Sequence, residues 1–146
     1  MSDFDDIKTV FFRFEETGCN GSNNSDMKFF DDCNFVFQLD RRGSGDFITF
    51  TNGVECASAK FIEDSKSIYT DFGFSHIGGL STDIGALKKK GLKVSAANIS
   101  SGYYDPHSSF ETVNIKALEN SYNMVSEFFN KFGNVRYDHE RTVYKP

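Results

Sequence analysis

The sequence contains no tryptophan, only two prolines and only three cysteines among its 146 residues. Cys19, Cys33 and Cys56 stand at spacings of 14 and 23 residues, which match no zinc-ribbon or CxxC pattern, and their odd number argues against a full disulfide framework. The chain lacks an apolar run of about 18 residues that could cross a membrane. Its acidic N-terminus has no apolar signal-peptide core. We therefore expect a reduced, cytoplasmic protein that does not bind membranes.

Positive charge is also scarce. Lysine and arginine number 16 against 21 aspartates and glutamates, which gives a formal net charge of −5. The one basic cluster, Lys88–Lys90, lies near an expected helix end, where cations interact favourably with the helix dipole. This composition excludes the electrostatic footprint of a nucleic-acid binder. Hydrophobic residues make up 38%, including 17 phenylalanines, which suffices for one packed domain or part of a larger one.

The pattern of apolar residues predicts strands that alternate with helices. Strands are expected over 5–14, 34–39, 46–51, 69–74 and 92–99, and helices over 25–33, 54–66, 82–90 and 114–131. Flexible or polar loops are expected over 17–24, 76–81 and 100–109, followed by a short extended piece at 111–113. The strands at 34–39 and 46–51 could form a hairpin or a bent pair. We therefore expect a three-layer α/β/α fold with a mixed sheet.

The expected helix over 114–131 has the clearest apolar face. Its apolar residues recur at spacings of 3, 4, 3, 4 and 3 and are Ile115, Leu118, Tyr122, Val125, Phe129 and Phe132. We expect this face to cover one side of the sheet. Gly133 ends the helix, so the chain divides into a domain over 1–133 and a charged C-terminal tail over 134–146.

The stretch Phe11–Ser22 carries the first candidate site. An apolar run ends there in two adjacent carboxylates, Glu15 and Glu16, and a glycine-containing loop follows. Carboxylates at the carboxyl end of a strand in an α/β sheet lie where such folds bind ligands. One of them could hold a metal ion while the other moves protons. The alternative is a solvated glutamate pair before a surface loop.

Further candidates follow later strands. Asp40 comes directly after an apolar strand, and His107 lies in a proline-containing loop after another strand. If the first two strands are parallel neighbours, Glu15, Glu16 and Asp40 collect at one edge of the sheet. Carboxylates with a histidine are the ligand set of a zinc or mixed hard-metal hydrolase. Asp40 could equally cap a turn and His107 could equally be a surface residue, whereas Asp83 fits a helix start better than a ligand.

Four motifs follow one another along the chain. They are EETGCNGS at 15–22, LDRRG at 39–43, GLSTD at 79–83 and GYYDPH at 102–107. In this order and spacing they resemble the second half of the catalytic domain of the co-catalytic zinc aminopeptidases and carboxypeptidases, the peptidase T-like clan. The resemblance covers most of residues 7–130 and implies the zinc-peptidase α/β fold, of which this chain would hold the C-terminal half.

The resemblance also implies a role for each candidate residue. Glu15 matches the general base that activates the metal-bound water. Glu16 matches a ligand of one zinc ion, Asp40 a ligand of the other, and His107 the terminal histidine ligand on the same ion as Glu16. The implied activity is that of a metallopeptidase or related amidohydrolase, which uses two zinc ions to hydrolyse an amide bond of a peptide-like substrate.

The chain departs from this family because it lacks the first half, which supplies a His-x-Asp motif and a bridging carboxylate. We therefore expect a partner, either the complementary N-terminal half or another copy of the chain. A truncated product and a non-catalytic remnant with a binding or structural role are alternatives. A further alternative is a nucleotide or phosphate binder that uses the loop from Gly18 to Gly21, although this loop lacks the Lys-Ser/Thr ending of a P-loop.

Overall fold

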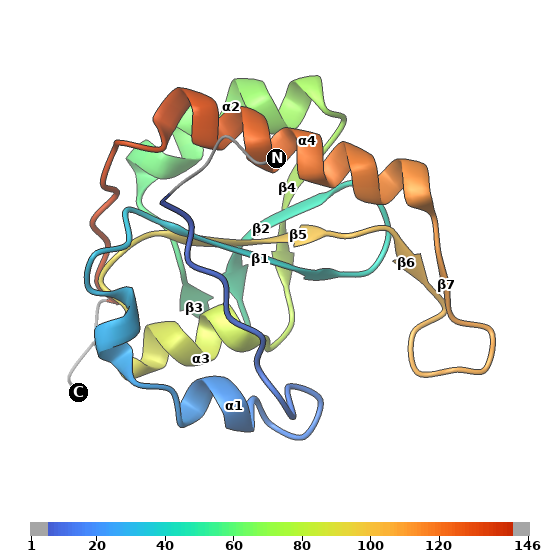
Figure 1. The fold of residues 1–146 in the computed structure, drawn as a ribbon, viewed down its shortest axis with the longest axis horizontal. Helices are drawn as coiled ribbons and strands as arrows, with labels where there is room; N and C mark the ends of the chain where they lie inside the picture. Colours follow the sequence, from blue (N-terminus) through green and yellow to red (C-terminus); the bar gives the residue numbers. More distant parts are fainter. Residues whose placement is uncertain (1–5, 142–146) are drawn as a thin grey trace.

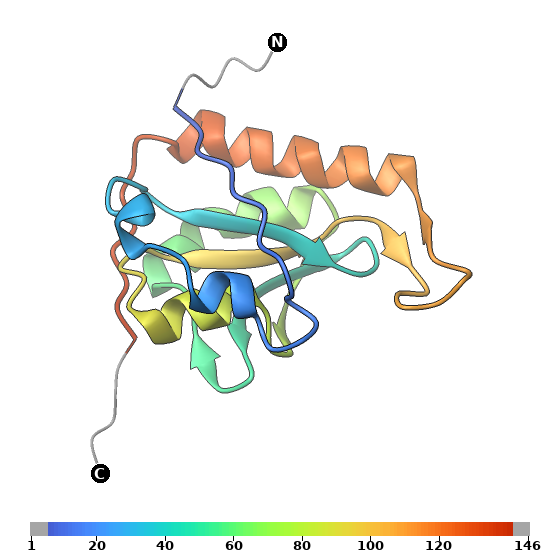
Figure 2. The same cartoon turned by 60° about the horizontal axis from the view of Figure 1, so that its bottom comes forward.

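The computed structural model describes residues 6–141, which form an α/β fold around a mixed sheet (Figure 1). The strands are β1 (Val36–Arg41), β2 (Asp46–Thr51), β3 (Val54–Glu55), β4 (Ser75–Gly79), β5 (Ala96–Ser100), β6 (Tyr103–Tyr104) and β7 (Thr112–Val113). The helices are α1 (Asn20–Asn23), the 3-10 helix η1 (Met27–Phe30), α2 (Ala59–Asp71), α3 (Asp83–Lys90) and α4 (Ile115–Phe132). Helices α2 and α4 lie on one face of the sheet, and α1 and α3 on the other (Figure 2). The expected α/β class with a mixed sheet is confirmed.

The sheet is arranged around β5. This strand pairs in parallel with β1 and antiparallel with β2, and β2 pairs in parallel with β4 and antiparallel with the short β3. All five residues of β5 are buried, as is typical of a strand covered on both faces. The expected hairpin of 34–51 is wrong, because β5 lies between β1 and β2. That insertion comes from a strand far along the chain, so local sequence does not indicate it.

A strand was expected over 5–14, of which the structure describes 6–14. This segment before Glu15 is extended, but it is not a strand. None of residues 6–14 pairs with another strand. Lys8 contacts Asp32 and the carbonyl oxygen of Phe29, and Phe12 packs at the margin of the core. The side chain of Phe11 is 90% exposed. An apolar sequence favours a strand only where a neighbouring strand is available to accept its hydrogen bonds.

Two other stretches differ in type from their sequence pattern. Within 69–74, expected as a strand, the residues up to Asp71 belong to α2. Within 76–81, expected as a flexible loop, most residues belong to β4. Gly79 in this strand packs so closely that a Cβ atom there would lie 2.9 Å from Cγ2 of Ile48. The glycine therefore permits close packing against β2 rather than flexibility.

The helices follow their sequence signals more closely. Helices α3 and α4 begin and end within one residue of the expected bounds. Helix α2 begins later than expected because Val54–Glu55 pairs with β2, and Ser58 then caps the helix by accepting a hydrogen bond from the N–H of Phe61 at 3.2 Å. The expected helix over 25–33 is reduced to the single turn η1. No helix within residues 6–141 is long and apolar enough to span a bilayer.

A cluster of aromatic side chains fills the space between the sheet and helices α2 and α4. Its buried aromatic members are Phe35, Phe47, Phe61, Tyr69, Phe74, Phe128 and Tyr137. A second buried cluster, which includes Ile84 and Leu87 of α3, fills the space on the opposite face. Burial of this apolar surface is the main force that holds the helices to the sheet.

The face of helix α4 that is buried differs from the one that the spacing of its apolar residues predicts. Its fully buried residues are Ser121, Met124 and Phe128. The second half of the expected apolar face, Val125, Phe129 and Phe132, packs at the margin of the core. The first half, Ile115, Leu118 and Tyr122, is exposed, so the expectation that it covers the sheet is wrong. The apolar stripe therefore contacts the core only along the C-terminal half of the helix.

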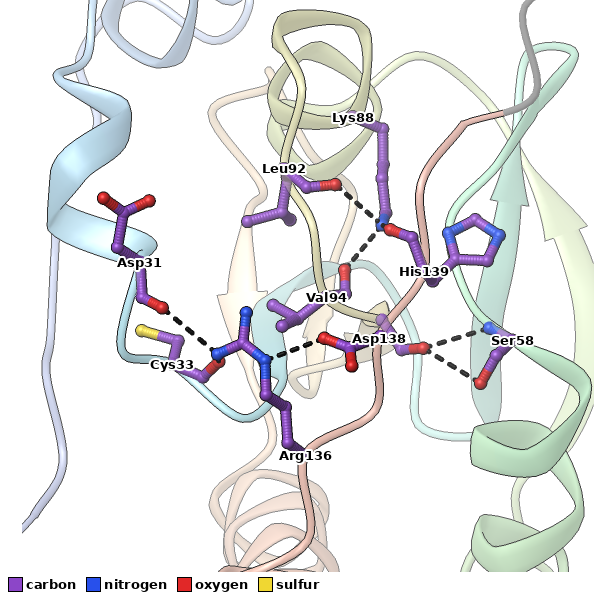
Figure 3. Close-up of polar contacts among 10 residues, drawn as sticks. Asp31, Cys33, Ser58, Lys88, Leu92, Val94, Arg136, Asp138 and His139 are labelled. Carbon is purple, nitrogen blue, oxygen red and sulfur yellow. Dashed lines mark hydrogen bonds and ion pairs between the residues drawn. The ribbon is translucent and has the colours of Figure 1, made fainter.

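The described part of the expected C-terminal tail, residues 134–141, packs against the domain (Figure 3). The ring of Tyr137 is buried in the aromatic cluster. The guanidinium of Arg136 donates hydrogen bonds to the carbonyl oxygens of Asp31 and Cys33, at 3.1 and 2.8 Å. These contacts fasten the chain after α4 to the segment that leads into β1.

Lys88 of α3 connects the chain before β5 to the C-terminal segment, 134–141, from inside the protein. Its Nζ donates hydrogen bonds to the carbonyl oxygens of Leu92, Val94 and His139, at 3.1, 2.5 and 2.6 Å (Figure 3), although the residue is only 1% exposed. Burial lowers the pKa of Lys88 to about 8. The side chain is therefore still charged at neutral pH, and its three N–H groups match three carbonyl oxygens.

Replacement of Lys88 by methionine preserves the apolar stem and removes the donor for three buried carbonyl groups. We expect the free energy of unfolding to fall by roughly 2–4 kcal/mol, because unpaired buried carbonyls keep their desolvation penalty. Urea denaturation measures this change. Lys89→Met, at the exposed neighbouring position, is the control and should change stability by less than about 0.5 kcal/mol. Equal stability of the two variants would contradict the role of Lys88.

Candidate active site

The expected site residues come from three separate segments that meet at one end of the sheet. Because β1 and β5 are parallel, their carboxyl ends lie together. Asp40 belongs to the end of β1, and His107 lies in the loop between β6 and β7, shortly after β5; Figure 1 labels these strands. Glu15 and Glu16 follow the extended segment that leads to the same place. Ligand sites of α/β sheets typically form at this position.

Glu16 and His107 are in direct contact. Nε2 of His107 lies 2.9 Å from Oε1 of Glu16, and the two side chains are 62% and 67% exposed. The main-chain N–H of His107 donates a hydrogen bond to Oε2 of Glu111 at 3.1 Å, which holds the loop around the histidine. A carboxylate and an imidazole that meet at the surface are two ligands that one zinc ion could share.

Glu15 has an unusual environment for a carboxylic acid. Partial burial, followed by the charges of Asp40, Glu16 and Asp83, raises the pKa of Glu15 to about 7, while a hydrogen bond with the Thr82 side chain opposes the shift. A carboxyl group with a pKa near neutrality can accept and release a proton at physiological pH. Such shifts are common at functional sites.

Asp40 belongs to the same electrostatic cluster. Its side chain reaches the surface, but surrounding protein atoms remove enough water to raise the pKa of Asp40, and the charges of Asp83 and Glu16 raise it further. A hydrogen bond from Gln38 and the charge of His107 lower it. The carboxylates and the histidine therefore interact electrostatically from three segments of the chain.

Two residues that the resemblance gave no role also belong to the site. Burial raises the pKa of the Tyr103 hydroxyl, and the charges of Asp40, Glu16 and Glu15 raise it further. Asp83 begins α3, as expected, and its buried carboxylate also accepts a hydrogen bond from the Ser22 hydroxyl at 2.5 Å. The second contact ties α3 to α1, which follows the loop of Glu16, and no sequence pattern predicts it.

The loops that carry the site residues have a strained backbone. Among the described residues, five other than glycine have a positive φ, and four of these, Phe14, Cys19, Asp105 and His107, lie in the two loops of the site. Their φ values are 61°, 55°, 50° and 63°. Such conformations cost of order 1–3 kcal/mol each and concentrate at functional sites, where surrounding contacts impose them.

The glycine loop is not arranged to bind a phosphate group. The main-chain N–H groups of residues 18–21 all donate hydrogen bonds to carbonyl oxygens of residues 13–15, at 2.8 to 3.2 Å. A phosphate-binding loop presents such N–H groups to its ligand. The observed hydrogen bonds therefore argue against the nucleotide- or phosphate-binding alternative.

The described residues of the cluster do not by themselves form a metal site. No group of three or more His, Cys, Asp and Glu side chains within residues 6–141 is arranged to hold a metal ion. Glu16 and His107 meet, whereas Asp40 and Glu15 interact with them only at longer range. Structural zinc takes four ligands, and catalytic zinc takes three protein ligands and a water. The oxygen and nitrogen donors present fit zinc chemically but leave each coordination sphere open.

Comparison with known proteins adds no further assignment. No family model matches the chain, and neither a curated protein nor a solved structure shows significant similarity to it. The zinc-peptidase resemblance therefore rests on the four motifs and remains a prediction.

The pKa of Glu15 predicts a pH dependence of stability. The folded chain binds the proton of Glu15 up to about pH 7, whereas the unfolded chain releases it near 4.5. The folded state therefore binds more protons between these values, and the free energy of unfolding falls as pH rises through this window. Glu15→Gln should remove that loss and make the protein more stable than the wild type at about pH 8, by roughly 1 kcal/mol because solvent screens this partly exposed group.

Urea denaturation at about pH 4, 6 and 8 measures this difference, which should be small at the lowest pH. Glu63→Gln, at an exposed position of α2, is the matched control and should follow the wild type at all three values. A stability difference between Glu15→Gln and the wild type that is independent of pH would contradict the raised pKa.

Proposed function

We propose that this chain is the carboxylate-bearing part of a zinc-dependent amide hydrolase of the peptidase T-like type, acting on a peptide-like substrate. The observation that carries the proposal is the convergence of the motif residues. Glu15, Glu16, Asp40 and His107 come from three segments far apart in the chain and gather at one end of the sheet, where Glu16 and His107 are in contact.

In this proposal Glu16 and His107 would hold one zinc ion and Asp40 would contribute to the other. Bound zinc polarises the scissile carbonyl group and lowers the pKa of the attacking water. Glu15 accepts a proton from that water and delivers it to the nitrogen of the leaving amine. A pKa near neutrality suits a group that must first accept and then donate the same proton.

The proposal includes a partner that completes the site, either a complementary N-terminal half or a second copy. Two observations support a partner. The described residues leave the coordination spheres open, and the sequence has no His-x-Asp motif to close them. Among the described strands β1 pairs only with β5, so its outer edge is free, and large apolar side chains such as Phe11 and Ile115 are exposed. Free edges and apolar patches are typical of surfaces that bind another chain.

A non-catalytic protein on the same fold, with a binding or structural role, is the second candidate. It is favoured by the lack of a closed metal-binding group within residues 6–141. The two candidates differ in the consequence of changing Glu15, because only a hydrolase needs a proton acceptor at this position.

Zinc binding and hydrolysis can be tested separately on the full chain, purified with any polypeptide that accompanies it. Competition with a chromogenic chelator measures zinc affinity, and amine release from unblocked short peptides measures hydrolysis. We expect Glu16→Gln to weaken zinc binding by at least about tenfold, because a direct ligand is lost. Glu15→Gln should keep the zinc affinity within about threefold and lower kcat by at least about 100-fold, the usual contribution of a general base.

Glu63→Gln, far from the cluster on α2, is the control and should change neither quantity. Zinc binding that does not depend on Glu16, or hydrolysis that does not depend on Glu15, would overturn the assignment of these residues. A preparation that binds zinc and hydrolyses no peptide would favour the non-catalytic candidate.

A further inference from the structure

The pairing of β1 with β5 is irregular at Asp40. Leu39 lies opposite Ile99 and Arg41 lies opposite Ser100, so Asp40 is an extra residue in β1 with no counterpart in β5. Such a β-bulge leaves the main-chain groups of the extra residue without a ladder partner. Bulges are frequent beside active sites, where they redirect a side chain.

The side-chain amide of Asn98 replaces the missing partner. The main-chain N–H of Asp40 donates a hydrogen bond to Oδ1 of Asn98 at 3.2 Å, and Nδ2 of Asn98 lies 3.5 Å from the carbonyl oxygen of Asp40. Asn98 is only 3% exposed, so water cannot readily take over these contacts. One side chain of β5 thus satisfies both main-chain groups of the bulge.

The same amide belongs to a hydrogen-bond network that reaches the N-terminus of α3. Nδ2 of Asn98 lies 3.4 Å from the hydroxyl oxygen of Thr82, the residue directly before α3. The Thr82 hydroxyl donates a hydrogen bond to Oε1 of Gln38 at 2.9 Å, and Nε2 of Gln38 lies 3.3 Å from Oδ2 of Asp40. The network therefore links the main chain and the carboxylate of Asp40 to the N-terminus of α3.

We propose that Asn98 is a positioning residue, which holds the bulge in β1 and thereby fixes the carboxylate of Asp40 relative to the N-terminus of α3. The consequence for metal binding rests on the proposed function, whereas the hold on the bulge does not. Residues that orient a metal ligand from behind typically contribute 10- to 100-fold to metal affinity.

The test compares Asn98→Ala with Ser100→Ala in the full chain. Ser100 is a matched control because it is buried in the same strand and its hydroxyl also makes two main-chain hydrogen bonds, with the N–H of Asp46 at 3.0 Å and the carbonyl oxygen of Arg42 at 2.9 Å. The hydrogen bonds of its hydroxyl go to Asp46 and Arg42 and not to Asp40, so Ser100→Ala measures the cost of losing a buried polar side chain at this end of β5.

The first measurement is amide hydrogen exchange by NMR. In Asn98→Ala we expect the Asp40 amide to exchange at least about tenfold faster relative to the other amides of β1, because only its acceptor is lost. Ser100→Ala should leave this ratio unchanged. A role of Asn98 in stability alone would accelerate all β1 amides together, and this result would overturn the proposal. If Asn98→Ala does not fold, Asn98→Ser replaces it, because serine keeps a polar group but is too short to reach Asp40. The exchange rate of the Asp40 amide relative to the other β1 amides is then measured in that variant.

The second measurement is zinc affinity by chelator competition, with Asp40→Asn as the reference for loss of the ligand. We expect Asn98→Ala to weaken zinc binding about tenfold and Ser100→Ala to change it less than threefold. Equal affinities of Asn98→Ala and Ser100→Ala, with Asp40→Asn weakened, would overturn the proposal. If the wild-type protein binds no zinc even when purified with any polypeptide that accompanies it, the proposed function fails, and the exchange ratio of Asp40 alone upholds or overturns the positioning role.

Discussion

The fold depends on the placement of β5 between β1 and β2. Its parallel pairing with β1 brings the carboxyl ends of the two strands to the same end of the sheet, where Asp40 and the loop of His107 follow. Its antiparallel pairing with β2 connects them to the rest of the sheet. The side chain of Asn98 in the same strand bridges the bulge at Asp40. Main-chain pairing at the buried centre of the sheet therefore determines where the candidate site forms.

The cluster of carboxylates carries a cost in stability. Burial raises the pKa of Glu15, Asp40 and Asp83 alike, the charge of Asp83 raises the pKa of Glu15 and Asp40 further, and strained residues lie in the adjoining loops. A protein selected for stability alone would have little reason to keep like charges and strained backbone together. The arrangement is understandable if a cation and a partner chain compensate these charges, and the contact of Glu16 with His107 provides a first point for such compensation.

Local sequence patterns predicted elements whose signals lie within a few residues. The bounds of β2 were predicted correctly, and those of α3 and α4 to within one residue. The patterns failed where the presence or absence of a distant partner strand determines the structure. The apolar segment before Glu15 has no partner strand and is not a strand, whereas the glycine-rich β4 pairs with β2. The order of the motifs indicated the candidate site residues, of which the structure brings Glu16 and His107 into direct contact. It could not indicate Asn98, Gln38 or Thr82, because their connection to Asp40 arises from side-chain hydrogen bonds between elements far apart in the chain.

We propose that these residues form part of a two-zinc site that another chain completes. Native mass spectrometry of the gently purified protein, with zinc content determined on the same sample, tests this most directly. We expect an assembly that contains a complementary polypeptide or a second copy, with about two zinc ions in each complete site. A zinc-free protein, whatever the size of its assembly, would contradict it.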